Sequence, residues 1–210
     1  MIEPAKTGKR DAYPAEVIAG CKQGDRACLG RVFRGEAPYV ERVLLRIVGS
    51  SPDVEDLLQA SLEQAIRAFP RFRGEASVRT WLTRIAVRTA MHHLKSPAQK
   101  RRASLQLVEG GEHQTADARA FEKTDARNRL RLLHEHLSEL DPKQHTAFVL
   151  FQVEGRSMDE VAALMDSSLS ATKSRVMWAR RKLLARLAKD PRAKGLYPEG
   201  EEGGDDEQQL

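Results

Sequence analysis

The chain has 210 residues, of which 31% are charged and 5% aromatic, a composition that allows modest helical cores but not one large core. The formal charge is +5, but residues 196–210 hold six acidic residues and no Lys or Arg, which leaves +11 on the other 195. No apolar run has the length of a membrane helix, no signal-peptide pattern is present and two cysteines are too few for a disulfide framework, so we expect a cytoplasmic protein without membrane insertion.

The basic body with an acidic end indicates a partner that carries a phosphate backbone. On charge alone, the alternative is a soluble basic protein with no such partner. Residues 191–210 are predicted to be an acidic disordered tail, and residues 1–12 are also predicted to be disordered because they are polar and terminal.

Three helical patterns are predicted in the first quarter of the chain. The first starts after Pro14, the second is capped by Asp25 and the third ends at Gly49, while Gly24 separates the first two. The apolar positions at helical spacing are Val17, Ile18 and Cys21, then Cys28, Leu29, Val32 and Phe33, then Val40, Val43, Leu44, Ile47 and Val48.

Residues 50–95 carry two further helical patterns joined by a short basic turn. Ser51 and Pro52 suit the cap and the first position of the earlier helix, and Pro70 ends it. The predicted apolar faces are Val54, Leu57, Leu58, Ser61, Ala65 and Phe69 on the earlier helix, and Val78, Trp81, Leu82, Ile85 and Thr89 on the later one. We expect Trp81 to pack in the core, with a base-stacking platform as the alternative.

The two helices differ in charge. The earlier one is acidic at its start, where carboxylates suit the positive end of the helix dipole. The later one carries a polar stripe beside its apolar face, made of Arg84, Arg88, His92 and Lys95. This pairing predicts a module that contacts two partners, one of them a polyanion.

The fold class is predicted to be all-α, with two small helical domains at 14–95 and 118–190. The stretch 96–117 has a proline, a glycine pair, a basic cluster and no apolar period, so it is predicted to be a flexible linker. After it, helical spacing returns in a stripe made of Ala126, Leu130, Leu133, Leu137 and Leu140.

The second domain ends in a helix-turn-helix pattern. Asp141 and Pro142 suit the start of one helix, Ser157 begins a capping box, and Ser168 suits the cap of the last helix. The predicted buried positions are Ala147, Phe148 and Phe151, then Val161, Ala162, Leu164 and Met165, then Thr172, Val176, Ala179, Leu183 and Leu187. The other faces of the last helix hold Lys173, Arg175, Arg180, Arg181 and Lys182, and Ser170, Lys173, Ser174 and Met177 share the face that would enter a DNA groove. The alternative is a helical hairpin within a larger bundle.

No catalytic or metal-ligating constellation is recognisable. The sequence lacks a nucleophile–base arrangement and a phosphate-cradling loop, so neither an enzyme nor a cofactor is expected. Cys21 and Cys28 are on the apolar faces of different helices, which favours buried small side chains over a zinc or redox site. Four histidines are expected to be solvated rather than to be ligands: His92, His93, His134 and His136.

Seven motifs follow one another along the chain: GDRA at 24–27, APYV at 37–40, DVEDLLQ at 53–59, FRGEA at 72–76, TWLTRIA at 80–86, TKSR at 172–175 and ARRKL at 179–183. Their residues and order resemble the extracytoplasmic-function (ECF) group of bacterial sigma factors, the small two-domain promoter-specificity subunits of RNA polymerase. The resemblance covers residues 14–95 and 126–187, nearly all of the chain that is predicted to be ordered.

The resemblance implies a role for each surface. The helix at 53–68 would dock on a coiled coil of the largest polymerase subunit through Asp53, Asp56 and Gln59. The loop after it would hold a base flipped out of the promoter's minus-ten element, and the basic stripe would follow the melted strand. These minus-ten candidates are Phe72, Arg73, Gly74, Glu75, Ala76, Ser77, Arg84 and Arg88. The last helix would read the minus-thirty-five duplex through Ser170, Lys173, Ser174, Arg175, Met177, Arg180 and Arg181.

Four positions depart from the usual pattern of this family. Ala60 stands where an acid is usual, which implies a weaker or shifted polymerase contact, and Arg88 stands where Asn is common, which implies a changed minus-ten preference. Trp178 replaces a frequent Arg, so one DNA contact is in question. Ser167 replaces an apolar residue of the turn, and Leu169 is expected to fill that space.

We therefore predict an ECF-type transcription initiation factor. Its implied partners are core RNA polymerase, promoter DNA in double-stranded and melted form, and an anti-sigma factor. The alternative is a free-standing helix-turn-helix regulator that needs no polymerase. A structural adaptor or an anti-sigma-like binder is disfavoured by the basic last helix.

Overall fold

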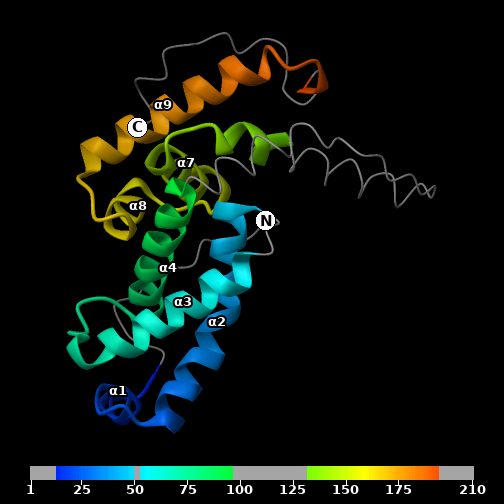
Figure 1. Cartoon of the computed structure of the whole chain (residues 1–210). Helices are drawn as coiled ribbons and strands as arrows, with labels where there is room; N and C mark the ends of the chain where they lie inside the picture. Colours follow the sequence, from blue (N-terminus) through cyan, green and yellow to red (C-terminus); the bar gives the residue numbers. More distant parts are fainter. Residues whose placement is uncertain (1–12, 50–52, 97–131, 194–210) are drawn as a thin grey trace, which may run out of the picture.

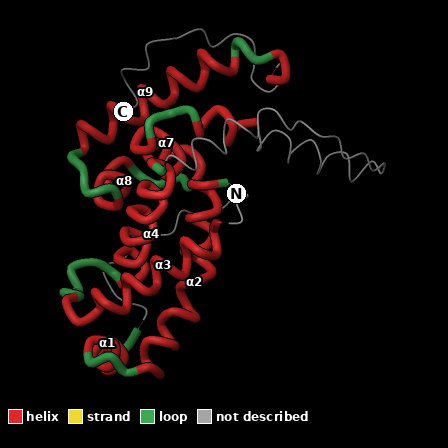
Figure 2. Tube along the Cα trace, in the orientation of Figure 1, coloured by secondary structure: helices red, strands yellow, loops and turns green. Residues whose placement is uncertain are grey.

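The computed structural model describes residues 13–49, 53–96 and 132–193, and all regular structure in these ranges is helical (Figures 1 and 2). The all-α fold class is therefore confirmed. In the described ranges no helix is both long and apolar enough to cross a membrane.

Several sequence predictions fall on residues that the structure does not describe. They are the disordered start at 1–12, the cap at Ser51 and Pro52, the linker at 96–117 beyond Ser96, the apolar positions Ala126 and Leu130, and the tail from 194 onward.

Helices α1 (Ala15–Lys22) and α2 (Arg26–Val48) pack against each other. Asp25 caps α2 as predicted, because its Oδ1 accepts hydrogen bonds from the backbone N–H groups of Ala27 and Cys28 at 2.7 and 3.0 Å. Gly24 has a φ of +81°, a backbone conformation that favours glycine, and it makes the turn between the two helices.

The prediction that α2 is two separate helices is wrong, because the helix continues through Pro38. Proline has a φ that suits a helix, and within a helix it removes one backbone hydrogen bond. The apolar residues on either side of it, Val32 and Val40, are 0% and 1% exposed in the same core. Burial of both segments against α3 and α4 therefore outweighs the local preference for a break.

Helix α3 (Asp53–Ala68) leads through the 3-10 turn η1 (Phe69–Arg71) and a loop to α4 (Val78–Lys95). Pro70 lies inside η1, so the predicted end of the helix is confirmed. Phe69, Phe72 and Trp81 form an aromatic cluster with ring centroids 5.1 to 5.6 Å apart. Trp81 therefore packs in the core, as expected.

The remaining helices are 132–138, α7 (Pro142–Phe148), the π-helical turn η2 (Val149–Val153), α8 (Met158–Leu164), α9 (Leu169–Leu187) and the 3-10 turn η3 (Pro191–Ala193). The predicted caps are confirmed: Asp141 accepts from two backbone N–H groups, Ser157 and Glu160 form a capping box, and Ser168 accepts from Ala171. The five predicted core positions of α9 are all buried. The π-helical turn was not predicted.

Two groups of helices result, and we refer to α1–α4 as the N-terminal group and to residues 132–193 as the C-terminal group. They are in contact, because α4 packs on α7 and α8, and α2 packs on η2 (Figure 1). The C-terminal group extends past the predicted start of the tail at residue 191, since Ala193 is only 6% exposed. Arg192 hydrogen-bonds to Asp190, which lowers the pKa of that carboxyl group.

The prediction of solvated histidines holds only for His92, which is exposed. His93 lies 3.3 Å from Asp53, and His136 lies 2.9 Å from Asp190. Burial lowers the pKa of His134. Helical spacing alone did not reveal these partners, because they belong to other elements.

The two cysteines are free thiols in the structure. Cys21 is buried, and burial raises the pKa of its thiol to about 11, which suits an inert core position. Cys28 is partly rather than fully buried, so the prediction holds in full for Cys21 alone. Across the described ranges, no group of three or more His, Cys, Asp or Glu residues is arranged to hold a metal ion.

Candidate nucleic-acid interface

The loop between η1 and α4 starts at a buried residue and has an exposed tip. Phe72 is 5% exposed within the aromatic cluster, so its ring fixes where the loop begins. Arg73, Gly74 and Glu75 are exposed beyond it, and Gly74 has a φ of +75°. Arg73 and Glu75 pair at 3.7 Å with side chains that are 82% and 77% exposed. The tip therefore presents charged and backbone groups to solvent.

The other end of the loop is fixed by the start of α4. Ser77 caps this helix, because its hydroxyl accepts a hydrogen bond from the backbone N–H of Thr80 at 3.2 Å. Its side chain also shares a 3.0 Å hydrogen bond with the Thr80 hydroxyl. Ser77 therefore fixes where the loop ends.

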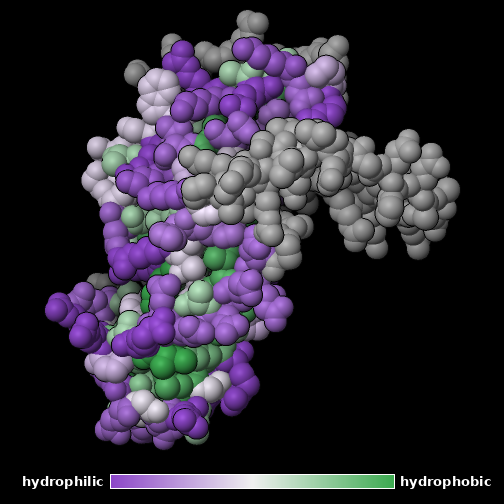
Figure 3. All heavy atoms as spheres, viewed as in Figure 1, coloured by the Kyte–Doolittle hydropathy of each residue, from purple (hydrophilic) through white to green (hydrophobic). Residues whose placement is uncertain are grey.

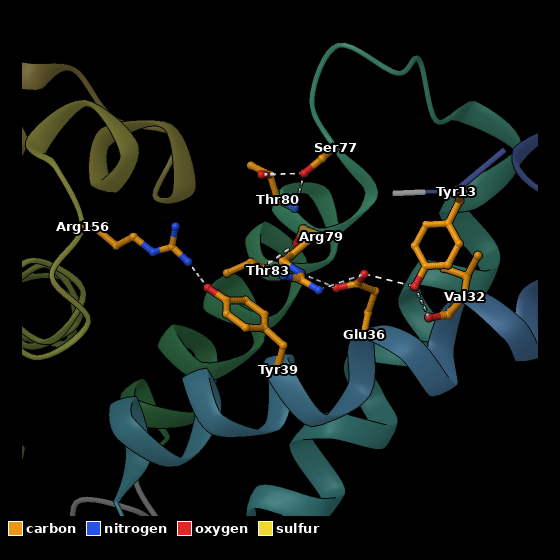
Figure 4. A network of polar contacts seen from close by, with 9 residues as sticks. All are labelled: Tyr13, Val32, Glu36, Tyr39, Ser77, Arg79, Thr80, Thr83 and Arg156. Carbon is orange, nitrogen blue, oxygen red and sulfur yellow. Dashed lines mark hydrogen bonds and ion pairs between the residues drawn. The ribbon is translucent and has the colours of Figure 1, made fainter. Parts of the chain in front are cut away.

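A buried polar network supports the start of α4 (Figure 4). Glu36 of α2 is 2% exposed and accepts from Arg79 Nε at 2.6 Å and from the Tyr13 hydroxyl at 3.1 Å. Burial and the Glu36 carboxylate raise the pKa of Tyr13 to about 12. This network was not predicted from the sequence, although Glu36 lies four residues from both Val32 and Val40 on an apolar face, which was a signal for it.

The basic stripe of α4 is confirmed in part. Arg88, His92 and Lys95 are exposed, whereas Arg84 is half-buried. Among the described residues, Arg84 Nε is shielded from solvent and has no hydrogen-bond partner. Arg88 pairs with Asp166, which lies in the turn of the helix-turn-helix. The stripe therefore contains one cation that is already engaged within the chain.

The candidate polymerase contacts lie near the start of α3. Asp56 and Gln59 are both exposed, and Gln59 donates a hydrogen bond to Glu63 at 3.2 Å. Asp53 is half-buried and faces His93 on α4. The structure thus leaves Asp56 and Gln59 open to a partner, whereas Asp53 helps to join α3 to α4.

Helix α9 buries one face and presents another. Ser170, Ser174 and Met177 are exposed on the second face, and Lys173 is half-buried beside them. The other candidate residues are Arg175, which is half-buried, and Arg180 and Arg181, which are exposed. The side of the molecule formed by α9 is mostly hydrophilic (Figure 3), which suits a phosphate-bearing partner.

The turn before α9 differs from the expectation. Leu169 does not fill the space at Ser167, because its side chain remains 39% exposed. Instead, the Ser167 hydroxyl shares a 2.7 Å hydrogen bond with Thr172, which is completely buried. A polar residue is tolerated in this turn because it has a buried partner. Nearby, Trp178 is 44% exposed and Arg181 lies 5.6 Å from the centre of its ring.

Comparison with known proteins matches both helical groups. Residues 32–101 match Sigma-70 region 2, and residues 130–183 match Sigma-70 region 4. The chain is 33% identical to the ECF RNA polymerase sigma-E factor of Salmonella typhimurium over 172 residues, which cover 78% of this chain and 88% of that protein. It is 25% identical to the RNA polymerase sigma-H factor of Pseudomonas aeruginosa over 171 residues, or 79% and 89% of the two chains.

A solved structure has a similar fold. It is the structure of CnrH in complex with the cytosolic domain of CnrY, with a TM-score of 0.57 and 22% identity, covering 83% of this chain and 97% of the other. The chain therefore belongs to the ECF group of the sigma-70 family of RNA polymerase sigma factors.

Proposed function

We propose that this chain binds core RNA polymerase through α3 and directs it to promoters that its loop and α9 read. Asp56 and Gln59 contact the polymerase. Residues 72–77 form the loop that holds a flipped base of the minus-ten element, with Arg84 and Arg88 along the melted strand. Helix α9 enters the major groove of the minus-thirty-five element. The family is not one of enzymes, in agreement with the expectation from the sequence.

The observation that carries this proposal is the presence of two different DNA-reading surfaces in one chain. The loop has both ends fixed, by Phe72 and by Ser77, and a free tip, which is the geometry that a pocket for an unstacked base requires. Helix α9 has a capped start and an exposed polar face, which suits a duplex. A free-standing regulator has no need of the first surface.

The same proposal includes an anti-sigma partner and the domain boundaries. We expect a protein that holds the factor inactive by covering polymerase-binding surface, because such control is implied by the family. We keep 14–95 and 118–190 as the two functional domains. Limited proteolysis is expected to cut within 96–117 and leave two folded fragments. Protection of that stretch while a helix is cut would contradict the boundaries.

Co-elution with core polymerase distinguishes the proposed function from the alternative, a free-standing helix-turn-helix regulator. The purified chain is mixed with core enzyme and passed through a size-exclusion column, with and without a duplex that carries the candidate promoter. The proposal expects a stable complex with core enzyme in the absence of DNA. A chain that binds the duplex alone and never co-elutes with polymerase would favour the free-standing regulator.

A further inference from the structure

We infer that residues 196–210, which we call the acidic segment, bind to the outer face of α9 and compete there with duplex DNA. The outer face is the side of α9 that points away from α7 and α8, on which the helix packs (Figure 1). The acidic segment belongs to the same chain, so the site and its occupant are always present together.

The charges of α9 and of the acidic segment are opposite and equal in number. Helix α9 has six basic residues and no acidic one: Lys173, Arg175, Arg180, Arg181, Lys182 and Arg186. The acidic segment has six acidic residues and no Lys or Arg: Glu199, Glu201, Glu202, Asp205, Asp206 and Glu207. The row of carboxylates therefore complements the basic helix in charge, as the phosphates of a duplex also do.

The outer face also has an apolar part. Met177, Trp178 and Leu184 are 49%, 44% and 39% exposed, and Arg181 lies over the Trp178 ring. Met177, Arg181 and Leu184 are spaced at i, i+4 and i+7, so they share one stripe of the helix. Neighbouring exposed apolar side chains are typical of a surface that contacts protein, because phosphates offer them no partner.

The start of the acidic segment is fixed close to the end of α9. The backbone N–H of Asp190 donates to the carbonyl of Leu187, the last residue of α9, at 3.1 Å, and Ala193 N–H donates to Asp190 O at 2.9 Å. Arg192 also pairs with Glu135 at 3.0 Å, and Ala193 is buried. The chain therefore enters the acidic segment from a fixed point beside the helix.

The acidic segment is long enough to cover the outer face. Its apolar residues Leu196 and Tyr197 follow Ala193 by three and four positions, which places them within roughly 10 to 14 Å of it. Glu199 and Glu207 can reach roughly 20 and 48 Å from the same point. Helix α9 has 19 residues and is therefore about 28 Å long. The apolar pair can thus cover the nearer part of the face while the carboxylates extend along the helix.

Each of these contacts is weak, but the two partners are tethered. Ion pairs that are open to solvent contribute little and are screened by salt. A short tether raises the effective concentration of the segment at the helix to the order of millimolar, so weak contacts are sufficient to occupy the face. A ligand that offers more contacts than the segment displaces it.

The consequence for DNA rests on the proposed function, whereas the contact itself does not. Arg181 is one of the candidate residues for the minus-thirty-five duplex, and the acidic segment would occupy it. The affinity for any duplex is then reduced by the fraction of molecules whose outer face is covered. Duplex that is held only by phosphate contacts is released first, because its binding is weak from the start.

Paramagnetic broadening in the full-length chain tests the contact. A nitroxide is attached at Gly204→Cys, and the native thiols are replaced by Cys21→Ala and Cys28→Ser. The chain has two tryptophans, so its NMR spectrum has two indole N–H signals. Trp178 reports on the outer face of α9, and Trp81, in the aromatic cluster of the N-terminal group, is the internal reference. Circular dichroism confirms that each labelled chain is folded.

Two variants change the acidic segment and one changes the helix. The first replaces all six acidic residues with the matching amides, and the second is Leu196→Ser with Tyr197→Ser, which leaves the net charge unchanged. The third is Arg181→Gln on α9. The matched controls are Gln208→Ser with Gln209→Ser for the uncharged pair, and Arg67→Gln, an exposed arginine of α3, for the helix.

We expect the nitroxide to broaden the Trp178 signal more than the Trp81 signal. Each of the three variants is expected to lower the paramagnetic relaxation rate of Trp178 roughly two- to fivefold, and both controls to leave it unchanged. Equal broadening of Trp178 in the unmodified chain and in the variant without the six charges would overturn the inference, because the tether alone would then explain it.

A gel shift with a duplex of unrelated sequence tests the competition. Leu196→Ser with Tyr197→Ser is expected to bind this duplex roughly two- to fivefold more tightly than the unmodified chain, without any change in net charge. Gln208→Ser with Gln209→Ser is expected to bind it as the unmodified chain does. Broadening that responds to the variants while duplex binding does not would overturn the competition and count against α9 as the duplex-reading helix, whereas the contact itself would stand.

Discussion

Glu36 and Arg79 join the middle of α2 to the start of α4, with 2.6 Å between Glu36 Oε2 and Arg79 Nε. The carboxylate is buried while the Arg79 side chain is about half exposed. The loop at 72–77 directly precedes the first turn of α4, which contains Arg79. The position of the loop at 72–77 therefore depends on a charge that is buried in the N-terminal core.

Replacing Glu36 with Gln tests that dependence. The amide keeps an acceptor for Tyr13 but removes the charge that Arg79 faces, so we expect the free energy of unfolding to fall by about 2 kcal/mol. Urea unfolding followed by circular dichroism measures the change. The matched control is Glu41→Gln, at an exposed position of the same helix, which is expected to have almost no effect. Equal stabilities of the two variants would show that the ion pair contributes nothing.

The polymerase interface gives a second prediction. Replacing Asp56 and Gln59 together with Ala is expected to weaken binding to core enzyme at least tenfold, which corresponds to about 1.4 kcal/mol. The melting temperature is expected to stay nearly constant, because both side chains are exposed. Binding is measured by fluorescence anisotropy of the labelled chain, with Glu41→Ala as the control. Unchanged affinity of the double variant would remove these residues from the interface.

Substitutions in α9 and in α4 are expected to affect different steps of promoter binding. Lys173→Ala or Ser174→Ala is expected to cost roughly 1–3 kcal/mol of duplex binding and to relax the preference at one position. Arg88→Ala is expected to leave duplex binding intact but to reduce promoter melting, because its target strand exists only after melting. A gel shift at low temperature and permanganate footprinting of thymines separate the two steps. Weaker duplex binding by Arg88→Ala with normal melting would contradict this division.

The caps that order the chain were predictable because their signals are local. Asp141, Ser157 and Ser168 each precede the N–H groups that they satisfy, so spacing in the sequence was sufficient. The buried face of α9 was predictable for the same reason, because its buried residues recur in the sequence at the spacing of a helix turn.

Other features depend on contacts between distant elements and were not predictable from spacing. Continuation of α2 through Pro38 is decided by burial against α3 and α4. The partners of Arg88 and Glu154 belong to the opposite group of helices. The burial of Phe72, a candidate residue of the minus-ten loop, is decided by the two other aromatic rings that enclose it.

A buried histidine gives a prediction about pH. Burial lowers the pKa of His145 to about 3 from an ordinary value of 6.5, with His134 as a further unfavourable neighbour. Below pH 6.5 the unfolded chain takes up a proton that the folded ring excludes, so stability is full above that pH and falls as the pH decreases. The free energy of unfolding is expected to fall by about 1 kcal/mol for this group between pH 7.5 and 5.5.

Urea unfolding at several pH values measures this slope. His145→Gln is expected to flatten it, whatever the variant does to stability at neutral pH. His92→Gln, at an exposed position of α4, is the control and is expected to keep the slope of the unmodified chain. A slope that is the same with and without His145 would contradict the assignment.

Run-off transcription measures whether the chain directs core polymerase to a promoter. Core polymerase is incubated with the chain and a template that carries the DNA upstream of its own coding sequence. We expect a discrete transcript that appears only when the chain is added and is lost when Asp56 and Gln59 are both replaced with Ala. Binding of the same DNA by the chain without any transcript from added core polymerase would contradict it.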